Sequence, residues 1–242
     1  MILKANRKMV ALVALVAMLA VAIPAIAEWN KGLEAYNKKD FATAATEFEE
    51  VTKTNPDYAG GFYMLGLCQR SLGQTSPAVA NLRKAVEIDK QVAEGEGKAP
   101  NASYAVGLAQ ALLQGKQYQE AYNLLKPMSM GSMDSRYRSS YALLFAQAAT
   151  KTNRGGEAIQ VLSSQIRADG SNPRLYQALG VAQDAEGDDA QAFAAFKKAY
   201  ELNSRELATG RSAVYSGIAA ARRTTSNSQK ATYYSQAGQI AD

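Results

Sequence analysis

The stretch AGGFYMLGLCQRSLGQTSPAVANLRKAVEIDK, residues 59–90, decides how this chain folds. Apolar residues at Phe62, Leu65 and Cys68 recur at helical intervals, and Gly73 then interrupts the run. A second run of apolar residues at helical spacing predicts a second helix, packed antiparallel to the first. The apolar side of that second helix carries Ala78, Leu82, Ala85, Val86 and Ile88.

The same pattern occurs three times in one register. Counted from Gly32 as position i, Gly66 stands at i+34, and Gly180 opens a third copy further along the chain. In each copy an alanine stands at i+12 from the glycine, and a phenylalanine or leucine stands at i+16. Glycine costs about 1 kcal/mol relative to alanine inside a helix, so a repeated glycine predicts that two helices pack closely there. The expected packing residues are Gly32, Ala44 and Phe48, then Gly66, Ala78 and Leu82, then Gly180, Ala192 and Phe196.

These residues and their period resemble the tetratricopeptide repeat (TPR) family. The resemblance rests on Phe62-x-x-Leu65-Gly66 and Tyr176-x-x-Leu179-Gly180, each followed by the alanine and the large apolar residue, and on the matching residues after Gly32. It implies an all-α solenoid of stacked helix pairs. The first helix of each pair would line a concave groove suited to an extended peptide or a partner's helix.

We therefore predict a TPR-type α-solenoid of about six antiparallel helix pairs over residues 28–242. In the third pair, Ala121 stands at i+14 from Gly107 rather than at i+12, which predicts a first helix or turn that is longer by two residues. The final pair has a more polar second helix, as a terminal repeat requires. Clear repeats are expected at 28–58, 59–92 and 173–206, and degenerate pairs at 102–129, 138–169 and 207–240.

Two connections depart from the compact pattern. Residues 91–101 hold Gly95, Gly97 and Pro100 among charged residues, which predicts a solvated loop. The second connection, residues 127–138, is rich in methionine. We interpret its methionines as flexible filler over the repeat beneath, the alternative being an adaptable binding lip. They are Met128, Met130 and Met133.

The N-terminus has the pattern of a secretory signal peptide. Three basic residues precede an apolar run from Met9 to Ile23, which is followed by Pro24 and then by Ala25-Ile26-Ala27. We expect cleavage after Ala27 and export to the periplasm or the medium, with no membrane span left after cleavage. The alternative is an uncleaved anchor, since the 19 residues from Met9 to Ala27 are about as long as the shortest membrane span.

Composition excludes several functional classes. The chain has no histidine and one cysteine, Cys68, so it holds no Ser-His-Asp triad, no Cys-His pair and no His/Cys zinc site. The formal net charge of +5 falls to +2 without the three basic residues of the leader, which is too balanced for a nucleic-acid surface. We expect no catalytic residues, no metal and no cofactor.

Three further features have plain structural interpretations. Cys68 lies in an apolar helical run and is expected to be an inert core thiol. The sequence Asn101-Ala102-Ser103 is a glycosylation sequon or, equally, a helix start capped by Asn101. An acidic cluster lacks the spacing of a calcium loop and is interpreted as a solvated turn. That cluster consists of Asp184, Glu186, Asp188 and Asp189.

The groove that the resemblance implies supplies the candidate site. Its aromatic and apolar residues near the N-terminus argue against the acidic chaperone tails that some TPR proteins bind. For the leucines we favour packing between repeats, whereas Trp29 and Tyr63 are expected to be exposed anchors, unless Trp29 is frayed. The candidate partner-binding residues are Trp29, Tyr36, Tyr63, Arg70, Tyr104, Gln147, Gln177 and Asp184, with Leu33, Leu67, Leu108, Leu143 and Val181 beside them.

These expectations favour a non-enzymatic scaffold or assembly factor of the cell envelope that binds a segment of a partner protein. One alternative is a structural protein that assembles with further copies of itself through the final helix pair. Another is an accessory domain that binds polysaccharide through exposed tyrosines.

Overall fold

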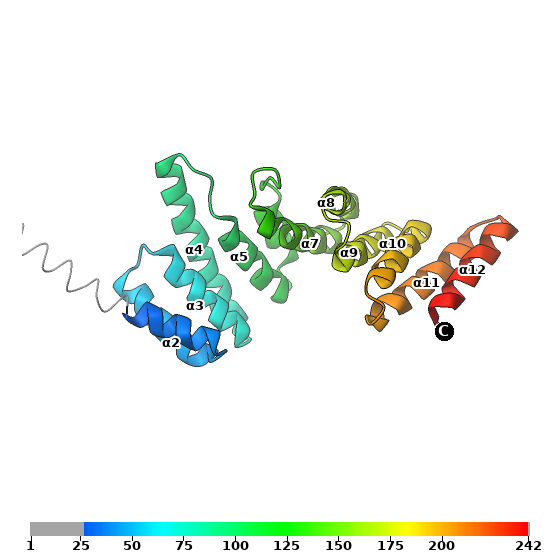
Figure 1. Ribbon diagram of the computed structural model, residues 1–242. Helices are drawn as coiled ribbons and strands as arrows, with labels where there is room; N and C mark the ends of the chain where they lie inside the picture. Colours follow the sequence, from blue (N-terminus) through cyan, green and yellow to red (C-terminus); the bar gives the residue numbers. More distant parts are fainter. Residues whose placement is uncertain (1–26, 242) are drawn as a thin grey trace, which may run out of the picture. The chain divides into compact units, whose positions relative to one another are not determined.

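A computed structural model describes residues 27–241 (Figure 1). This part of the chain is built of helices and holds no strand, which confirms the all-α class predicted from the sequence. The predicted leader, residues 1–27, lies outside the described residues except for Ala27.

The described residues form helices joined by short connections. The chain divides into two compact units, the first ending at Ala111 and the second beginning at Leu112. Residues 27–37 are helical and precede α2. The later helices are α2 (Phe41–Thr54), α3 (Ala59–Ser71), α4 (Thr75–Glu96), α5 (Ala102–Gln114), α6 (Tyr118–Leu125), α7 (Ser135–Lys151), α8 (Gly155–Ala168), α9 (Pro173–Ala185), α10 (Asp189–Leu202), α11 (Leu207–Arg223) and α12 (Asn227–Ala241).

The first unit packs around the small residues of the repeat. A Cβ on Gly66 would lie 2.6 Å from Cγ of Leu82, and one on Gly32 would lie 2.8 Å from the ring of Phe48. Leu82, Phe48 and Ala44 are fully buried. Each glycine is therefore the point at which the first helix of a pair meets the second, because a larger residue there would displace the facing side chain.

In every described pair before the last, a residue with positive φ closes the turn between the paired helices, seven positions after the small packing residue. Gly73 and Gly187 have φ values of +75° and +82°. The same position is held by Lys39 with φ +63° and by Asn153 with φ +57°. The left-handed region suits glycine and is unfavourable for a side chain such as that of lysine. The period of the repeat is thus present in the backbone as well as in the side chains.

The third pair corrects the predicted register. Lys116 has φ +58° and lies seven positions after Ala109, which is fully buried. Counted from Ala109 as position i, Ala121 stands at i+12, as in the clear repeats. The predicted insertion of two residues after Gly107 is therefore wrong. Gly107 has another function: a Cβ there would lie 2.7 Å from the ring of Tyr63, so the glycine makes room for a residue of the preceding pair.

The predicted loop at residues 91–101 is also corrected. Helix α4 continues to Glu96 and reaches 22 residues, against 14 in α2, α8 and α10. It ends at Gly97, whose φ of +65° allows the Lys98 N–H to donate to the carbonyl of Ala93 at 2.8 Å. Asn101 then caps α5 by accepting from the Ser103 N–H at 3.0 Å, as its helix-start interpretation predicted.

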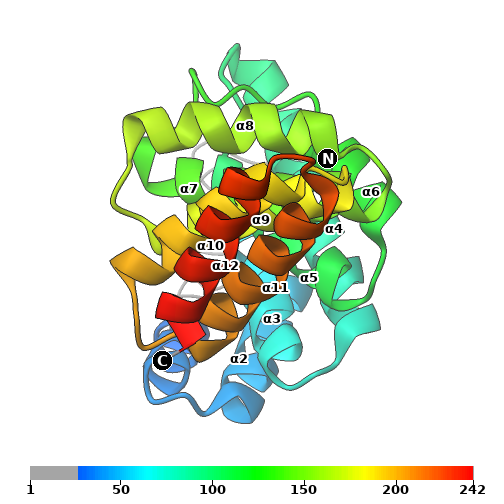
Figure 2. The ribbon, with the colours of Figure 1, turned by 90° about the vertical axis from the view of Figure 1, so that its right-hand side faces the viewer.

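In the second unit, helices α9 to α12 pack in chain order, as both views show (Figures 1 and 2). A Cβ on Gly180 would lie 2.8 Å from the ring of Phe196, so the third clear repeat has the same contact as the first two. The ring of Phe193 faces Gly217 of the next pair. Helix α12 buries Ala237 and leaves most of its other residues exposed, in agreement with a polar terminal helix.

The methionine-rich connection is partly buried. Met133 is buried, whereas Met128 and Met130 are half-buried. The Tyr141 hydroxyl lies 3.3 Å from the Leu125 carbonyl oxygen and 3.2 Å from that of Met128, which ties the start of the connection to α7. The filler interpretation is confirmed for Met133.

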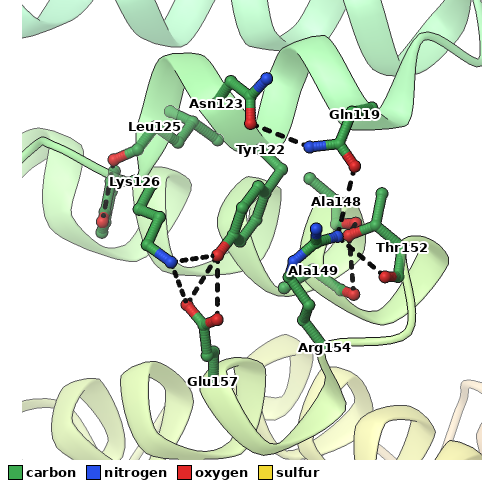
Figure 3. A network of polar contacts seen from close by, with 11 residues as sticks. Gln119, Tyr122, Asn123, Leu125, Lys126, Ala148, Ala149, Thr152, Arg154 and Glu157 are labelled. Carbon is green, nitrogen blue, oxygen red and sulfur yellow. Dashed lines mark hydrogen bonds and ion pairs between the residues drawn. The ribbon is translucent and has the colours of Figure 1, made fainter.

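A polar network joins α6 to the turn between α7 and α8 (Figure 3). The buried Tyr122 donates its hydroxyl hydrogen to the Glu157 carboxylate, with both oxygens at 2.9 Å. Lys126 donates to the same hydroxyl at 2.6 Å, and this bond is the main cause of the raised Lys126 pKa. The Arg154 guanidinium lies over the Tyr122 ring, 4.5 Å from its centroid, and donates to Gln119 at 3.3 Å. The network fixes α6 on the pair formed by α7 and α8.

Candidate functional site

A hollow of about 240 Å³ lies between α7 and α9, the first helices of two successive pairs. The two helices are in contact with each other. The chain reverses direction at residues 152–154 and again at residues 169–172, so α7 and α9 run the same way. The hollow is lined by Leu143, Ala146, Gln147, Thr150, Lys151, Arg174, Gln177, Ala178 and Val181, which we call the α7/α9 groove.

The floor of the α7/α9 groove is apolar and partly open to solvent. Leu143 and Ala178 are half-buried, while Val181 is 49% exposed. Exposed apolar surface that gathers in a hollow, next to polar groups, is typical of a binding site. Two amides, those of Gln147 and Gln177, add hydrogen-bonding groups to this floor.

Two exposed cations border the groove. Lys151 is the last residue of α7 and Arg174 is the second residue of α9. Because the helices run the same way, these two side chains lie toward opposite ends of the groove. Within residues 27–241, neither side chain forms a hydrogen bond or an ion pair, and no residue that lines the groove is acidic. The groove therefore presents uncompensated positive charge around an apolar centre.

The predicted groove residues of the second unit lie partly in this hollow. Gln147, Gln177, Leu143 and Val181 line it. Asp184, on the same helix as Val181, is exposed and does not line it. The repeat register thus brings together side chains from two helices that lie far apart in the sequence.

The predicted groove residues of the first unit contact one another. The rings of Tyr63 and Tyr104 meet edge to face, with centroids 4.9 Å apart, and Arg70 donates to Gln110. All four side chains are half-buried. These contacts link α3 to α5, so the residues serve packing between successive pairs, and their part in binding stays a prediction.

Trp29 is not the exposed anchor that we expected. Its ring packs edge to face against Phe48 at 5.3 Å and against Tyr58 at 5.4 Å, and it is half-buried. Tyr36 packs in the same way against Phe41 at 5.5 Å. Both residues border the core of the first pair and are not frayed. Leu67 and Leu108 are buried, as expected if the leucines pack between repeats.

Sequence reasoning missed Lys151 and Arg174. They lie outside the three positions per helix that the family resemblance marks as groove-lining. A signal was nonetheless present, because Arg174, Gln177 and Val181 recur at intervals of three and four and so share one face of a helix. Extending that face by one turn would have included the arginine.

The acidic cluster is only partly a solvated turn. Asp184, Glu186 and Asp188 are exposed, but Asp189 is 7% exposed and lies 2.8 Å from Nε of Arg223. The same arginine donates to the Gly187 carbonyl at 2.6 Å. The interpretation as a solvated turn is therefore wrong for Asp189, which ties α10 to the following pair.

The chemistry of the described chain is sparse. Within residues 27–241, no cluster of three or more His, Cys, Asp or Glu residues is placed to hold a metal ion. Cys68 is fully buried, and burial raises the pKa of its thiol to about 12, which confirms an inert core thiol. Among the helices of the same segment, none is both long and apolar enough to cross a membrane.

Comparisons with known proteins agree with this geometry. The sequence matches the tetratricopeptide repeat family at residues 30–93 and again at residues 173–206. A search of curated proteins found no match.

Several solved structures share the fold. A crystal structure of MamA is 21% identical, with a TM-score of 0.62, and the match covers 76% of this chain and 93% of MamA. YrrB, described as a TPR protein with an unusual peptide-binding site, is 14% identical with a TM-score of 0.63 and coverages of 76% and 89%. The C-terminal part of a TPR repeat-containing protein from Cytophaga hutchinsonii is 15% identical with a TM-score of 0.65 and coverages of 88% and 79%.

The family matches fall on the repeats that carry the glycine contacts, and the shared fold extends over most of the chain. The chain therefore contains tetratricopeptide repeats, over residues 30–93 and 173–206, and has a TPR-type solenoid fold.

Proposed function

We propose that this protein is a non-enzymatic interaction scaffold that binds a segment of a partner protein in the α7/α9 groove. The observation that carries the proposal is the open apolar floor of that groove, bordered by two cations that pair with nothing in the described chain. Burial of apolar surface favours association, and amides at the floor can bond to a partner's backbone. No bond-making chemistry is required of the site.

The size of the groove fits a short peptide segment. Its residues on α7 extend from Leu143 to Lys151, a rise of about 12 Å at 1.5 Å per residue. An extended chain advances about 3.3 Å per residue, so the groove would accept about four residues. TPR folds present such grooves along their first helices, which supports a peptide as the ligand class.

The proposal also concerns the compartment in which the scaffold acts. The signal-peptide pattern of residues 1–27 supports export, and we propose that the scaffold acts in the periplasm or cell envelope. A partner would then be another exported protein or the exported part of a membrane protein.

Self-assembly is the second candidate function. Leu207 and Tyr215 on α11 are 70% and 71% exposed, and Tyr234 on α12 is exposed as well. Large exposed side chains on a terminal pair would suit an interface between copies. A mass that rises with concentration in light scattering, and that Tyr215→Glu returns to the monomer value, would support this candidate.

Affinity capture with matched variants tests the scaffold proposal. Val181→Glu places a charge on the groove floor, whereas Val92→Glu makes the same change at a similarly exposed valine on α4 (52%). We expect the protein to capture a defined set of proteins from an envelope extract of its own organism. Val181→Glu should lose that set and Val92→Glu should keep it. Equal capture by both variants would remove the α7/α9 groove as the binding site.

A further inference from the structure

Resting on the proposed function, we propose that the occupant of the α7/α9 groove is a short extended segment with two carboxylate side chains and an apolar side chain between them. Lys151 and Arg174 would each bind one carboxylate, and the floor between them would take the apolar side chain. The charges, their positions and the length of the groove support this assignment in turn.

Arg174 lies at the start of α9, where the helix dipole does not stabilise a positive charge. The first turn of a helix carries partial positive charge, which disfavours a cation there. Arg174 occupies that turn in α9, is exposed, and bonds to no acidic group of the described chain. Its planar guanidinium is suited to bind a carboxylate through two hydrogen bonds. The residue is thus available for an acidic partner.

Lys151 supplies the second charge. It is exposed at the end of α7, where the helix dipole favours a cation, and no acidic side chain pairs with it in residues 27–241. Asp184 is the acidic residue of α9 nearest to Val181 in the sequence, and it does not line the groove. Positive charge at both ends therefore selects for negative charge at both ends of a ligand.

The separation of the two cations sets the spacing of the acidic residues. A groove of about 12 Å, at about 3.3 Å per extended residue, places the two carboxylates three to five positions apart. The floor between them consists of Leu143, Ala146, Ala178 and Val181, which would contact an aliphatic side chain. Gln147 and Gln177 are placed to bond to the backbone of the same segment.

Selection of displayed random nonapeptides on the purified protein tests the assignment. We expect enriched peptides to carry two Asp or Glu residues three to five positions apart with Leu, Ile or Val between them. Their affinity should fall about tenfold on Arg174→Gln or Lys151→Gln, and it should weaken with salt, as interactions between exposed charges do. Arg174→Lys, which keeps the charge, should retain part of the affinity.

Arg167→Gln is the matched control, because Arg167 is an exposed arginine on α8 outside the groove. It should leave affinity unchanged, and helical circular dichroism should be the same for every variant. Enriched peptides that lose binding on Val181→Glu but lack paired acids, or bind Arg174→Gln equally well, would overturn the inference and leave the scaffold proposal standing. If nothing is enriched, or Val181→Glu has no effect, both the groove and its proposed ligand are refuted.

Discussion

A Cβ placed on Gly66 would lie 2.6 Å from Cγ of Leu82 and 3.2 Å from the backbone oxygen of Ala78. The first contact could be relieved by a side-chain movement, whereas the second involves the main chain of α4. The two helices can therefore approach this closely only because residue 66 is a glycine and has no side chain.

Gly66→Leu should destabilise the protein by about 1–3 kcal/mol, because the added side chain overpacks the contact between α3 and α4. Gly95→Leu is the control in the same unit, since Gly95 lies within α4 and a Cβ there meets nothing within 4 Å. Denaturant unfolding followed by circular dichroism would measure both. A Gly66→Leu midpoint equal to that of the wild type would show that the two helices can separate freely.

Exchanging lysine and glycine at two positive-φ turn positions should change the stability of the protein in opposite directions. Lys116→Gly should stabilise the protein by about 1 kcal/mol, because lysine is strained at φ +58° and glycine is not. Gly73→Lys, at φ +75°, should destabilise it by a similar amount. The two substitutions exchange the same pair of residues between equivalent turns, so a shift of both in one direction would contradict the strain argument.

Tyr122→Phe should cost about 1–2 kcal/mol, because the change removes a hydroxyl that donates to the charged Glu157 and accepts from Lys126. Tyr234→Phe is the control, since Tyr234 is exposed and its hydroxyl forms no bond with another described residue. Thermal unfolding of the two variants gives the comparison. If the two variants have the same melting temperature, the network in Figure 3 contributes nothing to stability.

Cys68 should not react with iodoacetamide in the folded protein at about pH 8, because a thiol with a pKa of about 12 is almost entirely protonated there and is fully buried. In guanidinium chloride it should react at the rate of a free thiol, as mass spectrometry can follow. The pKa rises on folding from its ordinary value of 9.0, so the folded state loses stability as the pH increases from about 9 toward 12. Rapid labelling without denaturant would show that α3 opens frequently.

The repeat pattern was sufficient to predict the helices, since glycine, alanine and a large apolar residue at fixed intervals leave few other ways to pack. The prediction was wrong for the third pair, because Gly107 and Ala109 are both small enough to be its packing residue. The turn decides between them: Lys116 adopts positive φ seven positions after Ala109, and lysine gives no sequence signal for that conformation.

The end of α4 shows a different limit. Gly95 and the surrounding charges favour a loop by composition, yet the glutamate, lysine and alanine residues of this segment are good helix formers. The helix continues until Gly97 supplies a left-handed cap. Local composition alone could not show which of two neighbouring glycines ends the helix.

The candidate site was predictable only in part. The register placed Gln147, Gln177, Leu143 and Val181 on one surface, and the structure shows that they line one hollow. That Trp29 packs against Phe48 and Tyr58 could not be predicted, because Tyr58 lies outside the repeat register. Nor could the sequence show that the two cations of the groove lack acidic partners, since α9 itself carries the acidic residue Asp184.

The turn that recurs seven positions after the packing residue, in every described pair before the last, also affects how the chain reaches its fold. Each such turn closes a loop of about ten residues, for which the entropic cost of closure is small. Most contacts of a pair then form between residues close in the sequence, so folding should be fast and could start at any pair before spreading to its neighbours. One whole repeat could accordingly be gained or lost in evolution while the remaining pairs keep contacts of the same kind.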